Sequence, residues 1–142
     1  MAKETGVGTI TALSIDDSGG TLRDVRNSIT NFTFATPRGV QDVTGVDKSG
    51  MERLLLLADM SMELSGVFDD GADPSPHNVF KTVPSTSVAR EFSLNISAQI
   101  LGTTPSVTLL PTDYALTREA SGELTWSVPL VLANGAIPTW TT

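Results

Sequence analysis

Cysteine is absent from this 142-residue chain, which excludes a disulfide, a thiolate metal site and a cysteine nucleophile. Histidine occurs once, and His77 lies in a proline-bracketed loop without neighbours that would tune it or share a metal ion. The chain also lacks a Gly-x-Ser-x-Gly elbow, a phosphate-binding glycine loop and a His-Glu-x-x-His pattern. We therefore predict that the protein is not an enzyme and binds neither a metal nor a cofactor.

Basic residues are scarce, with 9 Lys and Arg against 16 Asp and Glu and a formal net charge of −7. Proteins that bind nucleic acid along its phosphates depend on clustered Lys and Arg, so we expect no such binding here. A surface that faces DNA and repels it stays compatible with this balance. The acidic run Asp69, Asp70 and Asp73 lacks the ligand spacing and closing Glu of an EF-hand, which favours a solvated loop. Asp16 and Asp17, followed by Ser-Gly-Gly, are typical of a turn.

Long apolar runs are missing as well. The longest, Leu54 to Ala58, is far shorter than the about 18 residues that a membrane span requires. The first ten residues lack the charged-then-apolar pattern of a secretory signal, so we expect no membrane and a cytoplasmic chain. A length of 142 residues and a hydrophobic content of 39% predict one domain, 1–142, with a substantial core.

One segment carries the signals of an α-helix. Ser49 and Glu52 have the spacing of a capping box, and the run from Met51 to Ala58 consists of strong helix formers. Its apolar side chains recur at i, i+3, i+4 and i+7, at Met51, Leu54, Leu55 and Ala58. We predict a helix over residues 49–59 and expect Glu52→Ala to cost about 1 kcal/mol through the lost cap.

The rest of the chain reads as strand. Apolar and polar residues alternate in Ser61 to Phe68, in Ile29 to Phe34, in Ser87 to Ala98 and around Trp126, while Pro111 interrupts a further strand. We predict an α+β, mainly β fold: a β-sandwich or partial barrel of six to eight strands with one flanking α-helix. Trp126 and Trp140 are interpreted as core and docking aromatics. Sparsely charged edge strands favour pairing with another chain.

Four segments are similar to a known family: Asp16 to Val25 (DDSGGTLRDV), Pro37 to Asp70, His77 to Arg90 (HNVFKTVPSTSVAR) and Thr112 to Pro129 (TDYALTREASGELTWSVP). They resemble tail tube (major tail) proteins of long-tailed bacteriophages that infect actinobacteria. The resemblance implies a sandwich that assembles as hexameric rings, in which strands of all subunits join into an inner β-barrel. Stacked rings then form the hollow tube through which the genome passes, with a long loop and the termini bridging the rings.

For this chain the resemblance implies a structural virion protein of the phage tail, assembled in the host cytoplasm. Its partners would be further copies of itself and other tail proteins (tape measure, tail terminator, distal tail), with double-stranded DNA passing without specific binding. Acidic residues should outnumber basic ones in the lumen. The candidate lumen residues on polar strand faces are Ser93, Asn95, Ser97, Gln99, Thr125 and Ser127. We expect the segment Asp16 to Asn31, or the loop Asp69 to Asn78, to bridge successive rings. The candidate inter-ring or inter-subunit contacts are Asp16, Asp17, Arg23, Arg26, Asp69, Asp70, Asp73 and Trp140.

Two alternatives stay open from the sequence. The first is another virion component with a similar sandwich, such as a tail terminator or a head decoration protein. The second is a β-sandwich module that binds carbohydrate or a host surface, for which an exposed aromatic platform around Trp126 or Trp140 would be the signature. Polymerisation that depends on concentration and needs no ligand would favour the tube.

Overall fold

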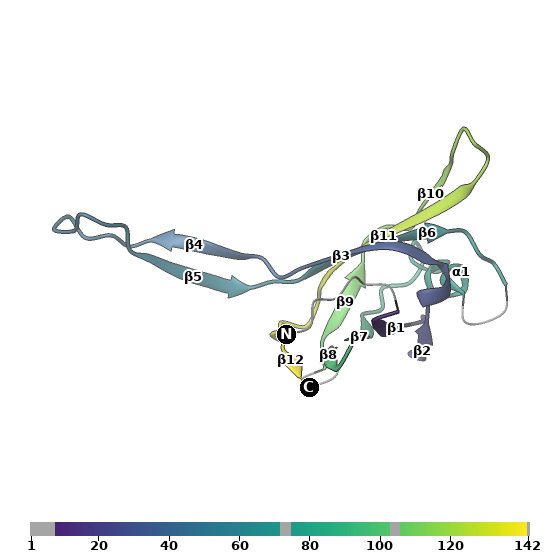
Figure 1. Ribbon diagram of the computed structural model, residues 1–142, viewed down its shortest axis with the longest axis horizontal. Coiled ribbons are helices and arrows are strands. Elements are labelled where there is room, and N and C mark those ends of the chain that lie inside the picture. The colour runs from purple at the N-terminus through teal and green to yellow at the C-terminus, as the bar shows by residue number, and fades with distance from the viewer. Residues whose placement is uncertain (1–7, 72–74, 103–105, 142) are drawn as a thin grey trace.

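The computed structural model describes residues 8–71, 75–102 and 106–141, and these contain twelve strands, one short α-helix and one 3₁₀ turn (Figure 1). The helix α1 spans Pro76–Phe80 and the 3₁₀ turn η1 spans Arg26–Ser28. The strands are β1 (Ile10–Asp16), β2 (Leu22–Asp24), β3 (Ile29–Ala35), β4 (Arg38–Asp42), β5 (Arg53–Ala58), β6 (Ser61–Val67), β7 (Arg90–Ile96), β8 (Gln99–Leu101), β9 (Thr108–Pro111), β10 (Ala115–Arg118), β11 (Leu124–Leu132) and β12 (Trp140–Thr141).

Ten of these strands form one curled antiparallel sheet, in the order β12-β8-β7-β9-β11-β6-β3. The sheet has two parts, which strand β7 connects. Arg90 and Glu91 of β7 pair with β9, whereas the rest of the strand pairs with β1 and β8. Strand β2 extends β1, and β10 pairs with the first half of β11. The predicted mainly β architecture is confirmed, with more strands than the six to eight expected, because several are only two to four residues long.

The core lies inside this curl and follows the alternation of the sequence. On β6, Met62 and Leu64 are buried while Glu63 is exposed, and on β11 Trp126 and Val128 are buried. Trp126 is 1% exposed and donates its indole N–H to the carbonyl oxygen of Val67 at 3.1 Å. The prediction of Trp126 as a core aromatic is thus confirmed, and its buried polar atom has the partner that burial demands.

The prediction of a helix over residues 49–59 is wrong. Residues 53–58 form strand β5, which among the described residues pairs only with β4, and Ser49 and Glu52 lie in the connecting loop. Glu52 makes no cap and instead lies 3.5 Å from Lys48 in an exposed ion pair, so the expected cost of Glu52→Ala loses its basis. The local helix signals are outweighed by pairing, because β4 and β5 continue the β3–β6 hairpin beyond Pro37 and Asp59 (Figure 1).

The α-helix lies instead at α1, a segment with ordinary start signals. Ser75 caps it by accepting a hydrogen bond from the backbone N–H of Asn78 at 3.3 Å, and Pro76 occupies the first turn. Val79 and Phe80 are buried in the core. Within the described residues no helix is long and apolar enough to cross a membrane.

One buried cation ties this helix to the sheet. Arg90 is 1% exposed, and its guanidinium donates to the carbonyl oxygens of Asp16 and Val79 and lies 5.7 Å from the centre of the Phe80 ring. Burial lowers the pKa of Arg90 from its ordinary value. The contact joins β1, α1 and β7 at one end of the curl.

Candidate assembly surfaces

The most prominent surface is a two-stranded arm, residues 38–58, which extends away from the body of the protein (Figure 1). Every residue of β4 is exposed, and in β5 only Ala58 is partly covered. Val40 lies opposite Leu55, and Gln41 lies opposite Leu54. Since opposed residues share a face of the ribbon, leucines occupy both faces. Leu57 is 91% exposed and Leu55 59% exposed.

The far end of the arm is an ordered loop. The Thr44 hydroxyl donates to Asp42 at 2.6 Å and accepts the backbone N–H of Glu52 at 2.8 Å, and the backbone N–H of Val43 donates to the Glu52 carbonyl at 3.0 Å. The hydroxyl and the backbone N–H of Thr44 both donate to the Asp42 carboxyl and lower its pKa. The arm therefore holds its shape through backbone pairing and a bonded tip rather than through burial of its apolar side chains.

The base of the arm is held by the C-terminal segment. Strand β12 pairs with β8, which places the Trp140 ring edge-on to Phe34 with ring centres 6.0 Å apart. Ile137 shares a shallow hollow with Leu55, Leu57 and Arg38. Trp140 remains 44% exposed, so it docks onto the body without entering the core.

A second surface is the outward face of the four-stranded part β3-β6-β11-β10. Register places Asn31 beside Ser65 and Thr33 beside Glu63, and on the other side of β6 it places Ser127 beside Ser65. This face consists mainly of small, uncharged side chains, and Glu63 is the one charged residue among the described residues on it. The described residues of this face are Asn31, Thr33, Ala35, Ser61, Glu63, Ser65, Val67, Ala115, Thr117, Thr125, Ser127, Pro129 and Val131.

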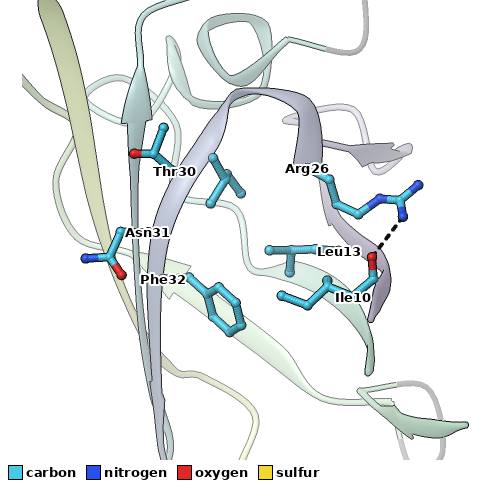
Figure 2. Close-up of a pocket in the computed structure, with 7 residues that line it drawn as sticks. Ile10, Leu13, Arg26, Thr30, Asn31 and Phe32 are labelled. Atoms are coloured by element: carbon cyan, nitrogen blue, oxygen red, sulfur yellow. Dashed lines mark hydrogen bonds between the residues drawn. The ribbon is translucent and has the colours of Figure 1, made fainter. Parts of the chain in front are cut away.

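The two margins of this four-stranded part have free edges. Among the described residues β3 pairs only with β6, and β10 pairs only with β11. Free strand edges present unpaired N–H and C=O groups and invite a further strand. Beneath the β3 edge lies a groove of about 410 Å³, between β3 and β1, floored by Ile10, Leu13, Ile29 and Phe32 (Figure 2).

The candidate lumen residues do not share one face. Thr125 and Ser127 lie on the polar face just described. Ser93 and Asn95 lie on β7, where that strand pairs with β1 and β8, and Ser97 and Gln99 belong to the next hairpin, Ser97 in its turn with φ 54°. The sequence suggested one long polar strand because the turn at Ser97 and Ala98 interrupts neither the alternation nor the composition.

The candidate contact residues also differ in their surroundings: some are buried or paired within the chain and others are exposed. Asp16 is buried and accepts the backbone N–H of Glu91, whereas Asp70 and Trp140 are exposed. Asp17 and Arg23 form an ion pair at 3.1 Å, and Arg26 pairs with Asp24 at 2.9 Å and donates to the Ile10 carbonyl. Asp69 accepts hydrogen bonds from Ser28 and from the backbone of Gly71. Asp73 lies outside the described residues.

Neighbouring carboxyls in the first turn have opposite electrostatics. Burial raises the pKa of Asp16, and its Oδ1 atom has no hydrogen-bond partner within the described part of the chain. The backbone N–H of Thr21, the Arg23 side chain and the N–H of Gly19 lower the pKa of Asp17 against a smaller effect of burial. The interpretation of this pair as turn formers fits the Asp17 contacts, since its carboxylate closes the turn.

His77, assigned from the sequence to a proline-bracketed loop, lies in the first turn of helix α1 and is half-buried. Its Nδ1 lies 3.0 Å from the Tyr114 hydroxyl, and its ring packs 5.0 Å from that of Phe68. Burial raises the pKa of Tyr114. The described residues contain no group of three His, Cys, Asp or Glu side chains arranged to hold a metal ion.

The arm itself was missed from the sequence, although a signal for it existed. Asp47-Lys48-Ser49-Gly50 has turn chemistry, and apolar residues flank it at Val40, Val43 and Leu54 to Leu57. Two apolar stretches separated by a turn predict a β-hairpin, and this signal is as strong as the capping box that predicts a helix.

Comparison with solved structures finds chains of the same fold in three other assemblies. No protein-family model matches the sequence, and no curated protein does. The solved structure of the virion of a native gene transfer agent particle contains a chain with a TM-score of 0.71 and 16% identity, covering 99% of this chain and 100% of that one. A chain in the C6-symmetric tail of the empty gene transfer agent particle has a TM-score of 0.67 and 13% identity, with 99% and 100% coverage. The fold is shared.

A third similar structure is the 6-fold symmetrised baseplate of the anti-feeding prophage, with a TM-score of 0.61, 11% identity and coverage of 99% and 97%. All three likenesses span nearly the full length of both chains. At these identities the likeness establishes the fold.

Proposed function

We propose that this protein is a structural tail component whose copies assemble into stacked hexameric rings and so form the hollow tube of a phage-type tail. It performs no catalysis in this role. The observation that carries the proposal is the arm: leucines on both faces of an exposed two-stranded ribbon require a partner surface, and the chain provides little of it. An isolated hairpin of this kind is marginal in water, whereas burial against another copy stabilises it by about 25 cal/mol per Å² of apolar surface.

The strand directions support closure into a ring. Strands β10, β11, β6 and β3 are each antiparallel to the next, so the first and last run in opposite directions. Copies related by rotation about an axis roughly along the strands keep their directions, and β10 of one copy then meets β3 of its neighbour antiparallel. An even number of strands thus allows a continuous antiparallel barrel without a free edge.

The polar face of those strands suits the wall of the bore. Serine, threonine and asparagine offer DNA no cationic anchor, and Glu63 would place one carboxylate per subunit in each ring. Phosphates are repelled by such a ring of charge, so the duplex can slide. The arm, which points away from this body, is suited to reach another subunit or the next ring (Figure 1).

Negative-stain electron microscopy over a concentration series tests the assembly. We expect rings or hollow tubes, in the absence of any ligand, at concentrations where light scattering also rises. Strictly monomeric particles at all concentrations, together with glycan retention on an array, would instead favour the carbohydrate-binding alternative. Exposed Trp140 is the aromatic that this alternative would use.

Cysteine labelling decides which face lines the bore, because the chain has no cysteine of its own. Ser127→Cys on the polar face should react with a small maleimide in the tube but be protected from one carried on a large polymer. Ser93→Cys on β7 is the matched control and should react with both. The reverse pattern would assign the bore to the β7 face and contradict this part of the proposal.

A further inference from the structure

The groove under the β3 edge is an unfilled extension of the core. Leu13 is 1% exposed on its floor, and Ile10, Ile29 and Phe32 pack against the core while staying partly exposed. Figure 2 shows Phe32 pointing from β3 toward Ile10 and Leu13 on the opposite side of the groove. At about 410 Å³ the groove is many times the roughly 30 Å³ of one water molecule, so whole side chains fit.

The hairpin of β10 and β11 carries exposed apolar side chains and projects beyond the body on the side away from the arm (Figure 1). Leu116 lies directly opposite the buried Trp126, so its side chain is on the core-facing side of the sheet. Arg118 lies opposite Leu124 on that same side. Because the hairpin outruns the core, Leu116 is 47% exposed and Leu124 36% exposed.

We propose that, in the ring, the β10–β11 hairpin of one copy fills the groove between β1 and β3 of the next copy, with Leu116 and Leu124 as the buried plug. This inference rests on the proposed function and names the contact that joins neighbouring subunits. A strand added to β3 lies about 4.8 Å beyond it, and its core-facing side chains must then point into the space under that edge. The two leucines are the apolar side chains that β10 and the start of β11 present on that side.

Charges at the two surfaces are compatible with this pairing. Arg26 lines the groove, and its ion-pair partner Asp24 lies in an adjoining hollow; their side chains are 43% and 40% exposed. The hairpin carries the exposed residues Arg118, Glu119 and Glu123 around its tip, one cation and two carboxylates. Either member of the groove pair therefore has an opposite charge available on the incoming hairpin.

A pair of charge substitutions on one strand tests the plug. Leu116→Glu places a carboxylate in the apolar groove, and we expect it to lower the yield of rings or tubes at least tenfold while leaving the circular dichroism melt of the monomer unchanged. The matched control is Thr117→Glu, one residue away on the outward face, which should still assemble. Equal assembly of Leu116→Glu and wild type would overturn the inference.

Oxidative cross-linking gives an independent readout in assembled protein. Leu116→Cys combined with Phe32→Cys, or with Ile29→Cys, should produce a ladder of covalent oligomers on a non-reducing gel. Thr117→Cys combined with the same partners should produce none. Tubes that form normally but yield no ladder from either pair would overturn the plug and leave the proposed function standing, whereas wild-type protein that never assembles overturns both.

Discussion

Strands β5 and β6 follow each other in the chain, separated by Asp59 and Met60, yet they belong to different physical settings. In β6, Met62 and Leu64 are buried and their neighbours face outward, so one chain completes the packing. In β5, four consecutive leucines are exposed on both faces of the arm. The comparison shows that one part of the long hairpin packs into the core of this chain, whereas the leucines of the other part stay exposed in the monomer.

The largest effect on stability is expected inside the body. Trp126→Ala removes a fully buried ring and its hydrogen bond to the Val67 carbonyl, and should lower the free energy of unfolding by about 3–5 kcal/mol. Chemical denaturation of the monomer measures this loss. Trp140→Ala is the control at the base of the arm, where partial exposure predicts a clearly smaller loss. Equal losses would contradict the division into core and docking aromatics.

A glycine substitution sharpens the same contrast between body and arm. A Cβ at Gly66, in β6, would lie 1.8 Å from the Ser28 carbonyl oxygen, a backbone atom that cannot move aside cheaply. Gly66→Ala should therefore destabilise the monomer by about 1–3 kcal/mol or more. Gly50→Ala, at the arm tip, meets no atom within 4 Å and should leave thermal melting nearly unchanged. A neutral Gly66→Ala would mean that β3 and β6 part easily.

Strands β5 and β6 also show which parts of the fold the sequence could predict. Alternation predicted β6 and the buried side of β11, because burial on one face leaves a period of two that needs no knowledge of partners. It could not predict β5, because leucines that occupy both faces of a ribbon leave no period of two, and leucines that follow a capping-box spacing then imitate a helix. Of the polar face, the sequence predicted Thr125 and Ser127. Glu63 and Asn31 lie on the same face because of the strand register, which the sequence alone does not reveal.

The first turn of the body offers a smaller effect with a sign that depends on pH. The depressed pKa of Asp17 means that its ionised form stabilises the fold above the ordinary aspartate pKa, and that this contribution is lost as the pH falls through the folded-state value. Asp17→Asn should lower the melting temperature at pH 7, with the deficit shrinking on acidification.

Asp16→Asn should act in the opposite direction. Its raised pKa means that the neutral form is favoured in the fold, so stability is greatest below the ordinary aspartate pKa and falls as the pH rises through the folded value. Asparagine keeps an acceptor for the N–H of Glu91 and should raise the melting temperature at pH 7, with the gain shrinking in acid. Parallel responses of the two variants would contradict the electrostatic difference between these adjacent carboxyls.

The smallest effect on monomer stability is expected in the arm, and it is there that assembly should fail. Leu55→Ser with Leu57→Ser changes two exposed side chains of one face, so unfolding should shift by no more than about 0.5 kcal/mol. Ring or tube formation, followed by electron microscopy, should nevertheless be abolished, because in the proposed tube the lost apolar area belongs to the interface between copies. The corresponding pair on the other face, Leu54→Ser with Leu56→Ser, shows whether one or both faces are covered. Normal tubes from both double variants would mean that the arm is not an assembly element, and that the exposed leucines of β5 need another explanation.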